Sequence, residues 1–413
     1  MTAVGAVAPV RTRHPVLEVM SERSYRNYWI SVFLSSLIFG GARFTWVWLV
    51  IKSPSQAALV GGIALGLPHL FFGIPAGVWA DRVDRRRLVC WASLAMAVVL
   101  ALSAWLEHTD RMDLAVACAT AAALGTLIAV VQPTQTAMVP ELVPRRLHVT
   151  GVALQNLAFQ SSFFTGSLAS GIIIRAFGIT AAFVAFAVMA VGAAVAILGA
   201  TPVNEVPREA PEVSMSILRS TGEGLRYMFA EQPRRSLALA NIVIGLISAS
   251  TAILVPKVAE SVLGADALGA SLLVGSMIPG MVVMTFVIAS RPQLRRRGLL
   301  FFVGMAAIVP QLAILGLSQV FLLSLLSSVF WGAPIGLFVT LVRQLTQEYT
   351  STEMMGRAMG VVHVLSRGTL PLVSFGLLFL TRVVSPSTAL VLLSGVVALF
   401  AAAIATTSEL RRA

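Results

Sequence analysis

The amino-acid sequence predicts an all-α integral membrane protein, with twelve transmembrane helices in two six-helix bundles related by pseudo-symmetry. Composition is the first reason: 57% of the 413 residues are hydrophobic and 12% are charged, whereas soluble chains carry about 25% charged residues. Length is the second reason. A helix needs about 20 apolar residues to cross a bilayer, so this chain has room for roughly a dozen helices with their loops.

A faint internal repeat is the third reason. The segment ADRVDRRRL at 80–88 resembles ASRPQLRRRGL at 289–299, and GVALQ at 151–155 resembles GVVHV at 360–364. Both pairs begin 209 residues apart (289−80 and 360−151). Two matches at one constant offset favour a duplicated chain, in which each half contributes six helices.

The first half is expected at residues 28–200, after a polar and basic segment at 1–27. Its tryptophans and tyrosine near the ends of the first apolar run suit the membrane interface, where amphipathic rings gather. Six apolar runs predict the helices of this half, at 28–50, 56–79, 88–106, 114–138, 149–174 and 179–200.

Residues 201–235 form the longest polar stretch, and we interpret them as a linker between the halves. Four prolines and several charges argue against a membrane span here, although a short surface helix is expected near 214–229. The second half is expected at 236–406, followed by a polar tail at 407–413. Its predicted helices lie at 237–256, 267–289, 299–317, 320–342, 358–381 and 388–406.

The distribution of Lys and Arg predicts the orientation. With both ends of the chain inside, 22 of the 30 Lys and Arg residues lie in inner segments and 5 in outer loops. The positive-inside rule therefore places both termini in the cytoplasm. The net charge of +12 is then a topology signal and not a sign of nucleic-acid binding. The predominance of Arg over Lys, 28 to 2, is typical of a GC-rich bacterial genome. We therefore expect a bacterial inner (plasma) membrane, with the lipid bilayer as the surrounding partner.

No enzyme motif is present in the sequence. The five histidines are isolated, and neither H-E-x-x-H, G-x-S-x-G nor a phosphate-binding glycine loop occurs. The two cysteines, Cys90 and Cys118, both fall in apolar runs, so no metal site, disulfide framework or cofactor is expected. A secondary transporter, which moves a small molecule through a site near the membrane midplane, remains as the function class.

The segment GVWADRVDRRRLV at 77–89 is the most specific motif. It resembles the turn between helices 2 and 3 of the major facilitator superfamily, whose pattern reads G-x-L-A-D-R-x-G-R-K-x-x-L. Trp79, Asp84 and Val89 depart from that pattern. The residues that carry the match, and that we assign to a gating motif, are Gly77, Asp81, Arg82, Arg85 and Arg86.

The resemblance implies a monomeric carrier that works by alternating access. It also implies that Asp81 and Arg85 make and break contacts with the start of helix 11, GRAMG at 356–360, in each cycle. The alternative is that the turn is only a positive-inside signal. The segments LGLPHLFFGIPAG and MVPELVPRR look most like the bacterial branch of siderophore exporters and macrolide-efflux carriers. That branch would make the protein a proton-coupled exporter, an antiporter of a small amphipathic molecule.

Two other functions stay open. The same fold would serve an uptake carrier for an organic anion. A non-transporting membrane receptor, or a partner of a biosynthetic complex, is a third reading, which the intact charged turn disfavours.

Charges inside the predicted helices are all positive, and they are candidates for substrate binding. Arg43 lies in helix 1 and Arg367 in helix 11, while no Asp or Glu lies well inside any predicted helix. We therefore expect an acidic substrate. Arg343 is close to the inner end of helix 10, where snorkelling explains it equally well. His69, in helix 2, is a candidate for carrying the coupling proton, because its reference pKa is about 6.5; a packing role is the alternative.

Polar residues on helices 4, 5, 7 and 10 complete the candidate site. In the resembling family, helices 1, 4, 7 and 10 line the cavity. Gln132, Asn241 and Trp331 are the expected substrate contacts of this kind. Gln135, Asn156 and Gln160 are further candidates, although hydrogen bonds between helices would account for such residues as well.

Overall fold

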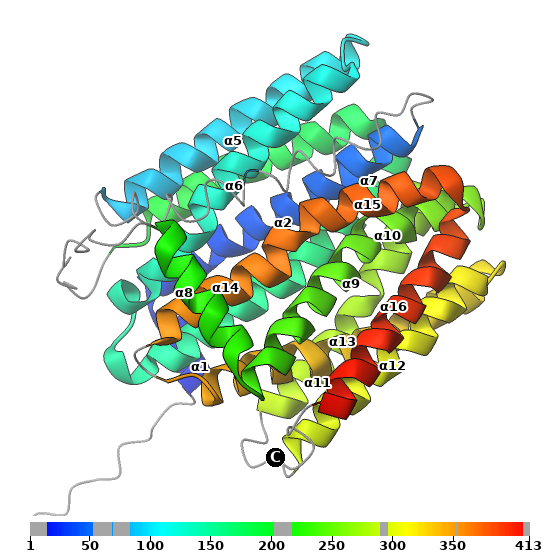
Figure 1. The fold of residues 1–413 in the computed structure, drawn as a ribbon. Helices are drawn as coiled ribbons and strands as arrows, with labels where there is room; N and C mark the ends of the chain where they lie inside the picture. The colour runs from blue at the N-terminus through cyan, green and yellow to red at the C-terminus, as the bar shows by residue number, and fades with distance from the viewer. Residues whose placement is uncertain are drawn as a thin grey trace, which may run out of the picture.

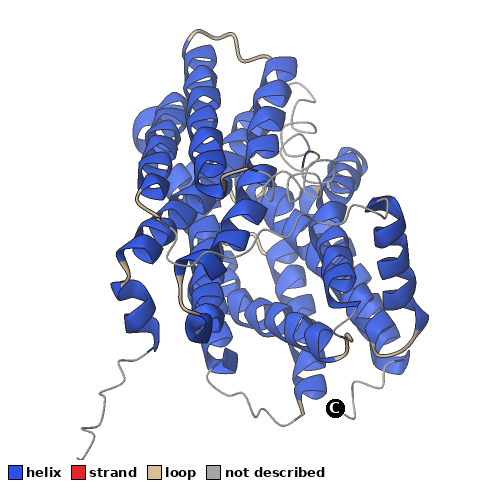
Figure 2. Ribbon diagram, turned by 90° about the vertical axis from the view of Figure 1, so that its left-hand side faces the viewer, coloured by secondary structure: helices blue, strands red, loops and turns tan. Residues whose placement is uncertain are grey.

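The computed structural model describes the backbone of residues 15–52, 68, 83–201, 217–289, 296–351 and 354–407. Within these residues every regular element is a helix (Figure 2). The predicted second helix, 56–79, lies outside the described residues apart from Pro68.

Four long or very long helices and two short ones belong to the first half (Figure 1). The short ones are α1 and the 3-10 turn η1. The elements are α1 (Pro15–Ser21), α2 (Arg23–Lys52), α5 (Arg85–His108), α6 (Leu114–Leu142), η1 (Arg145–Leu147) and α7 (His148–Leu198).

The second half begins with the linker helix α8 and ends with α16. A π-helical turn, η3, interrupts helix 11 of the predicted numbering. The elements are α8 (Ile217–Ala230), α9 (Arg234–Ser261), α10 (Ala267–Gly275), α11 (Met277–Ala289), α12 (Arg297–Leu317), α13 (Phe321–Glu348), α14 (Met355–His363), η3 (Val364–Gly368), α15 (Thr369–Val383) and α16 (Pro386–Thr407).

The fold is the predicted all-α membrane fold with twelve helices. In the described residues, nine helical segments are long and apolar enough to cross a membrane. One of them, Thr150–Leu198, has 49 residues and holds two crossings, because the backbone of Gly178 (φ 85°, ψ 174°) turns the chain between them. The shorter apolar helix Leu372–Val383 belongs to the predicted helix 11.

Four predicted helices differ in detail from the structure. Predicted helices 5 and 6 are joined end to end through Gly178 and not through a loop. Predicted helix 8 is broken at Ser276, between α10 and α11. Predicted helix 11 is divided into α14, η3 and α15. Each break leaves the apolar pattern intact, which is why composition alone did not reveal it.

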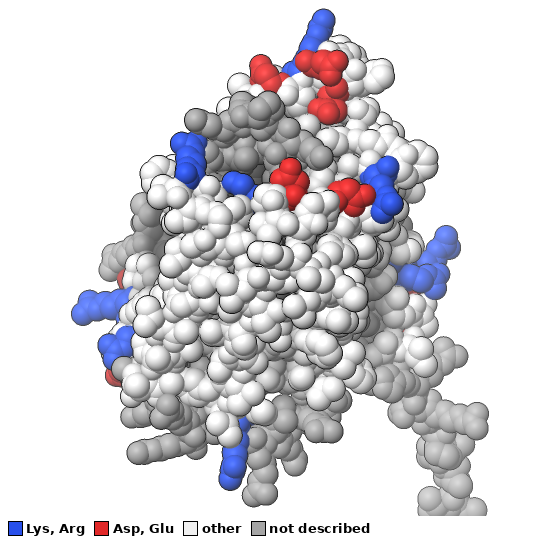
Figure 3. All heavy atoms as spheres, turned by 90° about the vertical axis from the view of Figure 1, so that its right-hand side faces the viewer, with Lys and Arg blue, Asp and Glu red and all other residues white. Residues whose placement is uncertain are grey.

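Each half has its own apolar core. One core joins α2, α5, α6 and α7, and the other joins α9 to α13, α15 and α16, with Phe44 and Trp48 of α2 packed into it. Large apolar side chains also point outward: Trp91, Val98, Leu102 and Trp105 form one exposed face of α5. On the face seen in Figure 3, charged side chains lie mostly near the rim and leave a broad uncharged area between them. These outward apolar faces suit a hydrocarbon environment.

The two ends of the bundle are distinguished by their connections. We call the end that holds α1 and α8 the linker side, and the end that holds the loops 109–113 and 262–266 the far side. On the far side the halves pack closely, since a Cβ at Gly171 of α7 would overlap the Ser271 side chain of α10. Nearby, Arg175 Nε lies 3.3 Å from Asp266 Oδ2. The two halves therefore meet on the far side.

Candidate functional site

A cavity of about 270 Å³ lies between the two halves. Helices α2 and α7 form its wall in the first half, and α9, α11, α13 and the helix-11 segments form the opposite wall. The polar and charged residues of the lining are Arg43, Asn156, Gln160, Ser167, Asn241, Ser248, Thr251, Arg343 and Ser366. Secondary transporters bind their substrates between their two repeats, so this cavity is the candidate binding site.

Arg43, predicted as a substrate contact, lines this cavity. Its side chain is only 7% exposed, and its guanidinium carbon lies 5.9 Å from the centre of the Phe163 ring. In the described part of the chain, no carboxylate forms an ion pair with it. Because a buried charge without a counter-ion is costly, this guanidinium is suited to an anionic ligand.

A second arginine of the cavity, Arg343, is solvent-exposed and lies near the linker-side end of α13. Its Nη1 donates a hydrogen bond of 3.4 Å to Asn156 Oδ1 of α7, so the contact joins the two halves. Snorkelling was one interpretation of this residue. The structure instead directs it to the cavity lining, together with Asn156 and Gln160.

The described lining residues include no Asp or Glu. The site therefore combines two guanidinium groups with amide and hydroxyl groups. Such a set can bind carboxylate, phosphate or sulfonate groups, because guanidinium donors form strong charge-assisted hydrogen bonds to oxyanions.

Asn241, another expected substrate contact, also lines the cavity and is 2% exposed. One N–H of its Nδ2 donates to the Leu237 carbonyl oxygen at 2.9 Å, which fixes the amide against its own helix. Arg367 lies in the π-helical turn η3, between the lining residues Ser366 and Leu370. Its side chain is outside what the structure describes.

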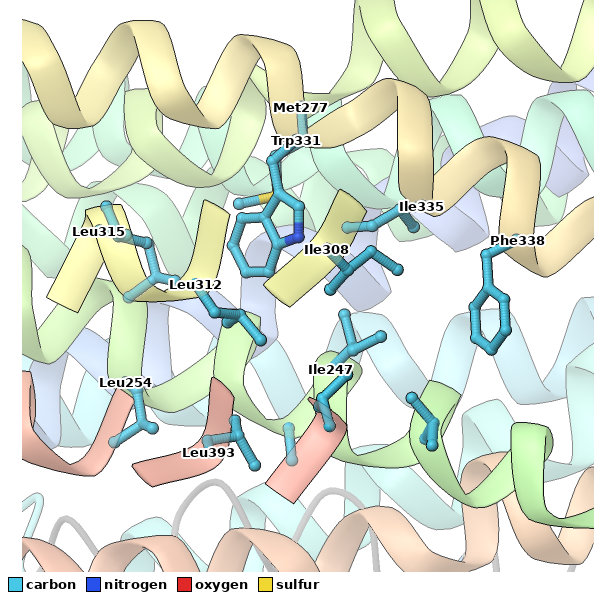
Figure 4. Packing of buried hydrophobic residues seen from close by; sticks show 14 of the residues in the cluster. Ile247, Leu254, Met277, Ile308, Leu312, Leu315, Trp331, Ile335, Phe338 and Leu393 are labelled. Atoms are coloured by element: carbon cyan, nitrogen blue, oxygen red, sulfur yellow. The ribbon is translucent and has the colours of Figure 1, made fainter. Parts of the chain in front are cut away.

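Trp331 and Gln132 are absent from the described lining of the cavity. The Trp331 indole is 1% exposed and lies among Met277, Ile308 and Leu312 in the core of the second half (Figure 4). Next to it, a Cβ at Gly332 would overlap the Met277 carbonyl oxygen. The close approach of α11 and α13 at this level leaves the indole on the core side.

Gln132 lies half-buried on α6, within the first half. One turn further along α6 lies Gln135. Its Nε2 donates hydrogen bonds to Ser31 Oγ at 3.4 Å and to Ser35 Oγ at 3.5 Å, both on α2. Gln135 therefore forms hydrogen bonds between α6 and α2. Such bonds between helices were the alternative to a substrate contact for these polar residues.

The charged turn is only partly described. Gly77, Asp81 and Arg82 lie outside the described residues, as does His69, and their roles stay predictions. Arg85 Nη1 lies 2.6 Å from Glu141 Oε1 at the end of α6 and donates to the Ala137 carbonyl oxygen at 3.0 Å. Arg86 is half-buried, and its backbone N–H donates to Asp84 Oδ1 at 2.9 Å.

The start of helix 11, the expected contact of the charged turn, is bound by α8. Arg357 Nη1 lies 3.0 Å from Glu223 Oε2. A Cβ at Gly224 would lie 2.9 Å from the Arg357 carbonyl oxygen, so the two helices touch backbone to backbone. The described contact of Arg85 is with α6 in its own half. The predicted contact of Asp81 with helix 11 lies outside the described residues.

Sequence reasoning missed the aromatic part of the cavity. Five phenylalanines of α2 and α7 line it: Phe39, Phe44, Phe159, Phe163 and Phe164. The spacing of four residues between Phe39 and Arg43, and between Phe159 and Phe163, puts each pair on one helix face. That spacing is a usable signal, but an apolar face toward lipid or core would look the same.

Comparison with known proteins identifies membrane transporters as relatives of this chain. A sequence model of the Major Facilitator Superfamily matches residues 28–370. The chain is 27% identical over 177 residues to the probable plastidic glucose transporter 2 of Arabidopsis thaliana, covering 38% of this chain and 34% of that protein. It is 25% identical over 139 residues to the probable metabolite transport protein CsbC of Bacillus subtilis (strain 168), covering 33% and 30%.

These matches span about a third of each relative's length. Among solved structures, the chain is similar to a POT family transporter in complex with 5-aminolevulinic acid. The TM-score is 0.72 at 12% identity, and the match covers 96% of this chain and 100% of that one. At this identity the likeness concerns the fold alone.

Proposed function

Because this chain belongs to the Major Facilitator Superfamily, we propose that it transports a small acidic molecule through the cavity between its halves, by alternating access. In this proposal it exports its substrate in exchange for protons, as a monomer in a bacterial plasma membrane with both termini in the cytoplasm.

One observation carries the choice of an acidic substrate. The cavity is lined by the buried Arg43 and by Arg343, and its described lining includes no carboxylate. A cationic drug would meet two like charges there and no counter-ion, which disfavours its binding. An oxyanion would supply the missing counter-charge of Arg43.

The lining also bears on substrate size. A cavity volume of about 270 Å³ lies just below the usual range of small-molecule pockets, about 300–1,000 Å³. It supports a substrate much smaller than the siderophores and macrolides of the branch that the sequence resembles. The glucose named for one relative is neutral, and two arginines are not needed to bind a neutral sugar.

The first experiment compares cells that carry the gene with cells that lack it, by untargeted mass spectrometry of cell extracts and spent medium. We expect an acidic metabolite to accumulate inside the cells and to decrease in the medium when the protein is absent. Slower consumption of a medium component in its absence would instead support uptake of an organic anion, which is the alternative direction.

The second experiment tests the arginine directly in proteoliposomes with the identified acid. The Arg43→Gln variant should bind and transport it about tenfold to a hundredfold less well, because a hydrogen bond to a charged group contributes about 1.5–3 kcal/mol. Arg111→Gln is the matched control, since Arg111 is exposed on the far side and outside the cavity lining. Equal transport by both variants would refute the acidic site at Arg43.

A further inference from the structure

The aromatic wall of the cavity surrounds the buried guanidinium. The Phe163 ring centre lies 5.4 Å from that of Phe39 and 5.3 Å from that of Phe164, in tilted and edge-to-face arrangements. Arg43 lies beside this cluster, over Phe163. A ligand whose anionic group binds Arg43 therefore has aromatic rings next to its body. Flat rings gain offset-stacked or edge-to-face contacts with such a wall, beyond the gain from buried area.

The opposite wall offers hydrogen-bond acceptors. The hydroxyls of Ser248 and Thr251 donate to the carbonyl oxygens of Ile244 and Ile247, at 2.8 and 2.9 Å, in their own helix α9. The Ser366 hydroxyl likewise donates to the Val362 carbonyl oxygen at 2.6 Å. Because each proton is used within the helix, these oxygens have only acceptor lone pairs left for a ligand.

The cavity is thus polarised across its width. The Arg43 guanidinium in the wall of the first half donates, while the α9 and η3 hydroxyls on the opposite wall, which also holds Arg343 of α13, accept. A ligand that satisfies both carries an anionic acceptor at one end and a neutral donor at the other. The donor has to be neutral, since an ammonium group would lie near Arg43 and Arg343 with no described carboxylate in the lining to pair with it.

We infer that the preferred substrate class is the small hydroxylated aromatic acids, with the carboxylate at Arg43, the ring on the phenylalanine wall and the hydroxyl toward Ser248 and Thr251. The cavity volume of about 270 Å³ is small for a ligand pocket, which suits a molecule with one substituted ring. This inference rests on the proposed function, because it needs an acid bound at Arg43.

The test measures binding to the purified full-length protein in detergent, with 4-hydroxybenzoate as the probe. Benzoate lacks the donor, 4-hydroxycyclohexanecarboxylate lacks the aromatic ring, 4-hydroxybenzyl alcohol lacks the charge, and 4-(aminomethyl)benzoate carries an ammonium group. We expect 4-hydroxybenzoate to bind about fivefold more tightly than benzoate, as one net hydrogen bond of about 1 kcal/mol predicts. The saturated-ring, neutral and ammonium compounds should bind more weakly still.

Variants at Ser248 and Thr251 test whether the preference for the hydroxylated acid depends on these two acceptors. In the Ser248→Ala/Thr251→Val variant, the ratio of the affinities for 4-hydroxybenzoate and benzoate should fall to about one. Thr251→Ser keeps a hydroxyl at this position and should retain the preference, provided that both proteins elute as single species in size-exclusion chromatography.

The outcomes separate the two proposals. Equal affinity for all the acids, with dependence on Arg43, would overturn the aromatic hydroxy-acid inference and leave the proposed function standing. Tight binding of 4-hydroxybenzyl alcohol that does not depend on Arg43 would overturn the proposed function, and with it the inference. The inference is also overturned if no compound binds at millimolar concentration.

Discussion

Two ion pairs occupy similar places in the two halves and differ in their surroundings. In the first half Arg85, at the start of α5, pairs with Glu141 at the end of α6; in the second half Arg297, at the start of α12, pairs with Glu348 at the end of α13. The first pair is 2.6 Å long with side chains 13% and 8% exposed. The second is 3.1 Å long with side chains 33% and 54% exposed.

The difference shows that an Arg–Glu pair repeated in both halves need not contribute equally to the stability of each half. A pair in water is screened and contributes about 0–1 kcal/mol. Removing one partner of a buried pair leaves an uncompensated charge and costs about 3–5 kcal/mol. The halves also differ just before these arginines. Asp84 caps α5 by accepting from the N–H groups of Arg86 and Arg87, whereas Arg296 precedes α12 in a left-handed conformation without a side-chain cap.

Glu141→Ala should have the largest effect. It removes the carboxylate that pairs with Arg85 at a largely buried place, where the two side chains are 13% and 8% exposed, so we expect a loss of about 3 kcal/mol or more. Thermal unfolding in detergent, followed by intrinsic fluorescence, measures the loss. The double variant Arg85→Gln/Glu141→Gln should recover much of it, because it removes both charges together. A double variant as unstable as Glu141→Ala would show that the cost is not electrostatic.

Asp84→Ala should come next, with a loss of about 1 kcal/mol. The substitution removes the oxygen that accepts from Arg86 N at 2.9 Å and Arg87 N at 3.3 Å, and losing such a helix cap costs about 0.5–2 kcal/mol. Asp84→Asn is the matched control, since its amide oxygen retains the cap. If both variants unfold at the temperature of the native protein, the cap does not stabilise α5.

Arg296→Gly should have an effect of the opposite sign. Arg296 has φ 61° and ψ 46°, a conformation that glycine adopts without steric cost, so we expect a gain of roughly 0.5–1 kcal/mol. Arg297→Gly, one residue further into the helix, should instead destabilise by roughly 0.5–1 kcal/mol. A loss of stability in both variants would contradict the conformational explanation.

Glu348→Ala should have the smallest effect, below about 1 kcal/mol, and it should vanish in 1 M salt because exposed charges are screened there. The Glu141→Ala effect should persist at the same salt concentration, since its surroundings exclude ions. Paired melting curves of the two variants at low and high salt make the comparison. Equal salt dependence would mean that burial does not distinguish the two pairs.

The sequence was sufficient for the fold class and for much of the helix pattern. The surface helix expected near 214–229 is α8, Ile217–Ala230, and the last helix, expected at 388–406, is α16, Pro386–Thr407. The break at Ser276 and the π-helical turn at Val364–Gly368 were not predicted. Hydropathy does not record either feature.

The candidate site was predictable where a residue type is rare in a membrane. Arg43 was proposed because a charge inside a span needs a reason, and Asn241 because it is a polar residue on a helix that lines the cavity in the resembling family. The phenylalanine wall was missed, and Trp331 was expected in the cavity, for one physical reason. In a membrane protein, the faces toward lipid, core and cavity are all apolar, so periodicity does not tell them apart.

The packing of α8 against the second half offers a site for a spin label that reports the relative motion of the two halves. Met228 of α8 is fully buried in a small apolar cluster with Ala358 and Val361 of α14 and Ala238 of α9, so the helix is fastened to the second half. Arg226 points outward from it. A spin label on Arg226→Cys would report how the second half moves relative to a label on the first, at a site that lies outside the cavity lining. Cys90 is buried and Cys118 half-buried, which limits their competition for the label.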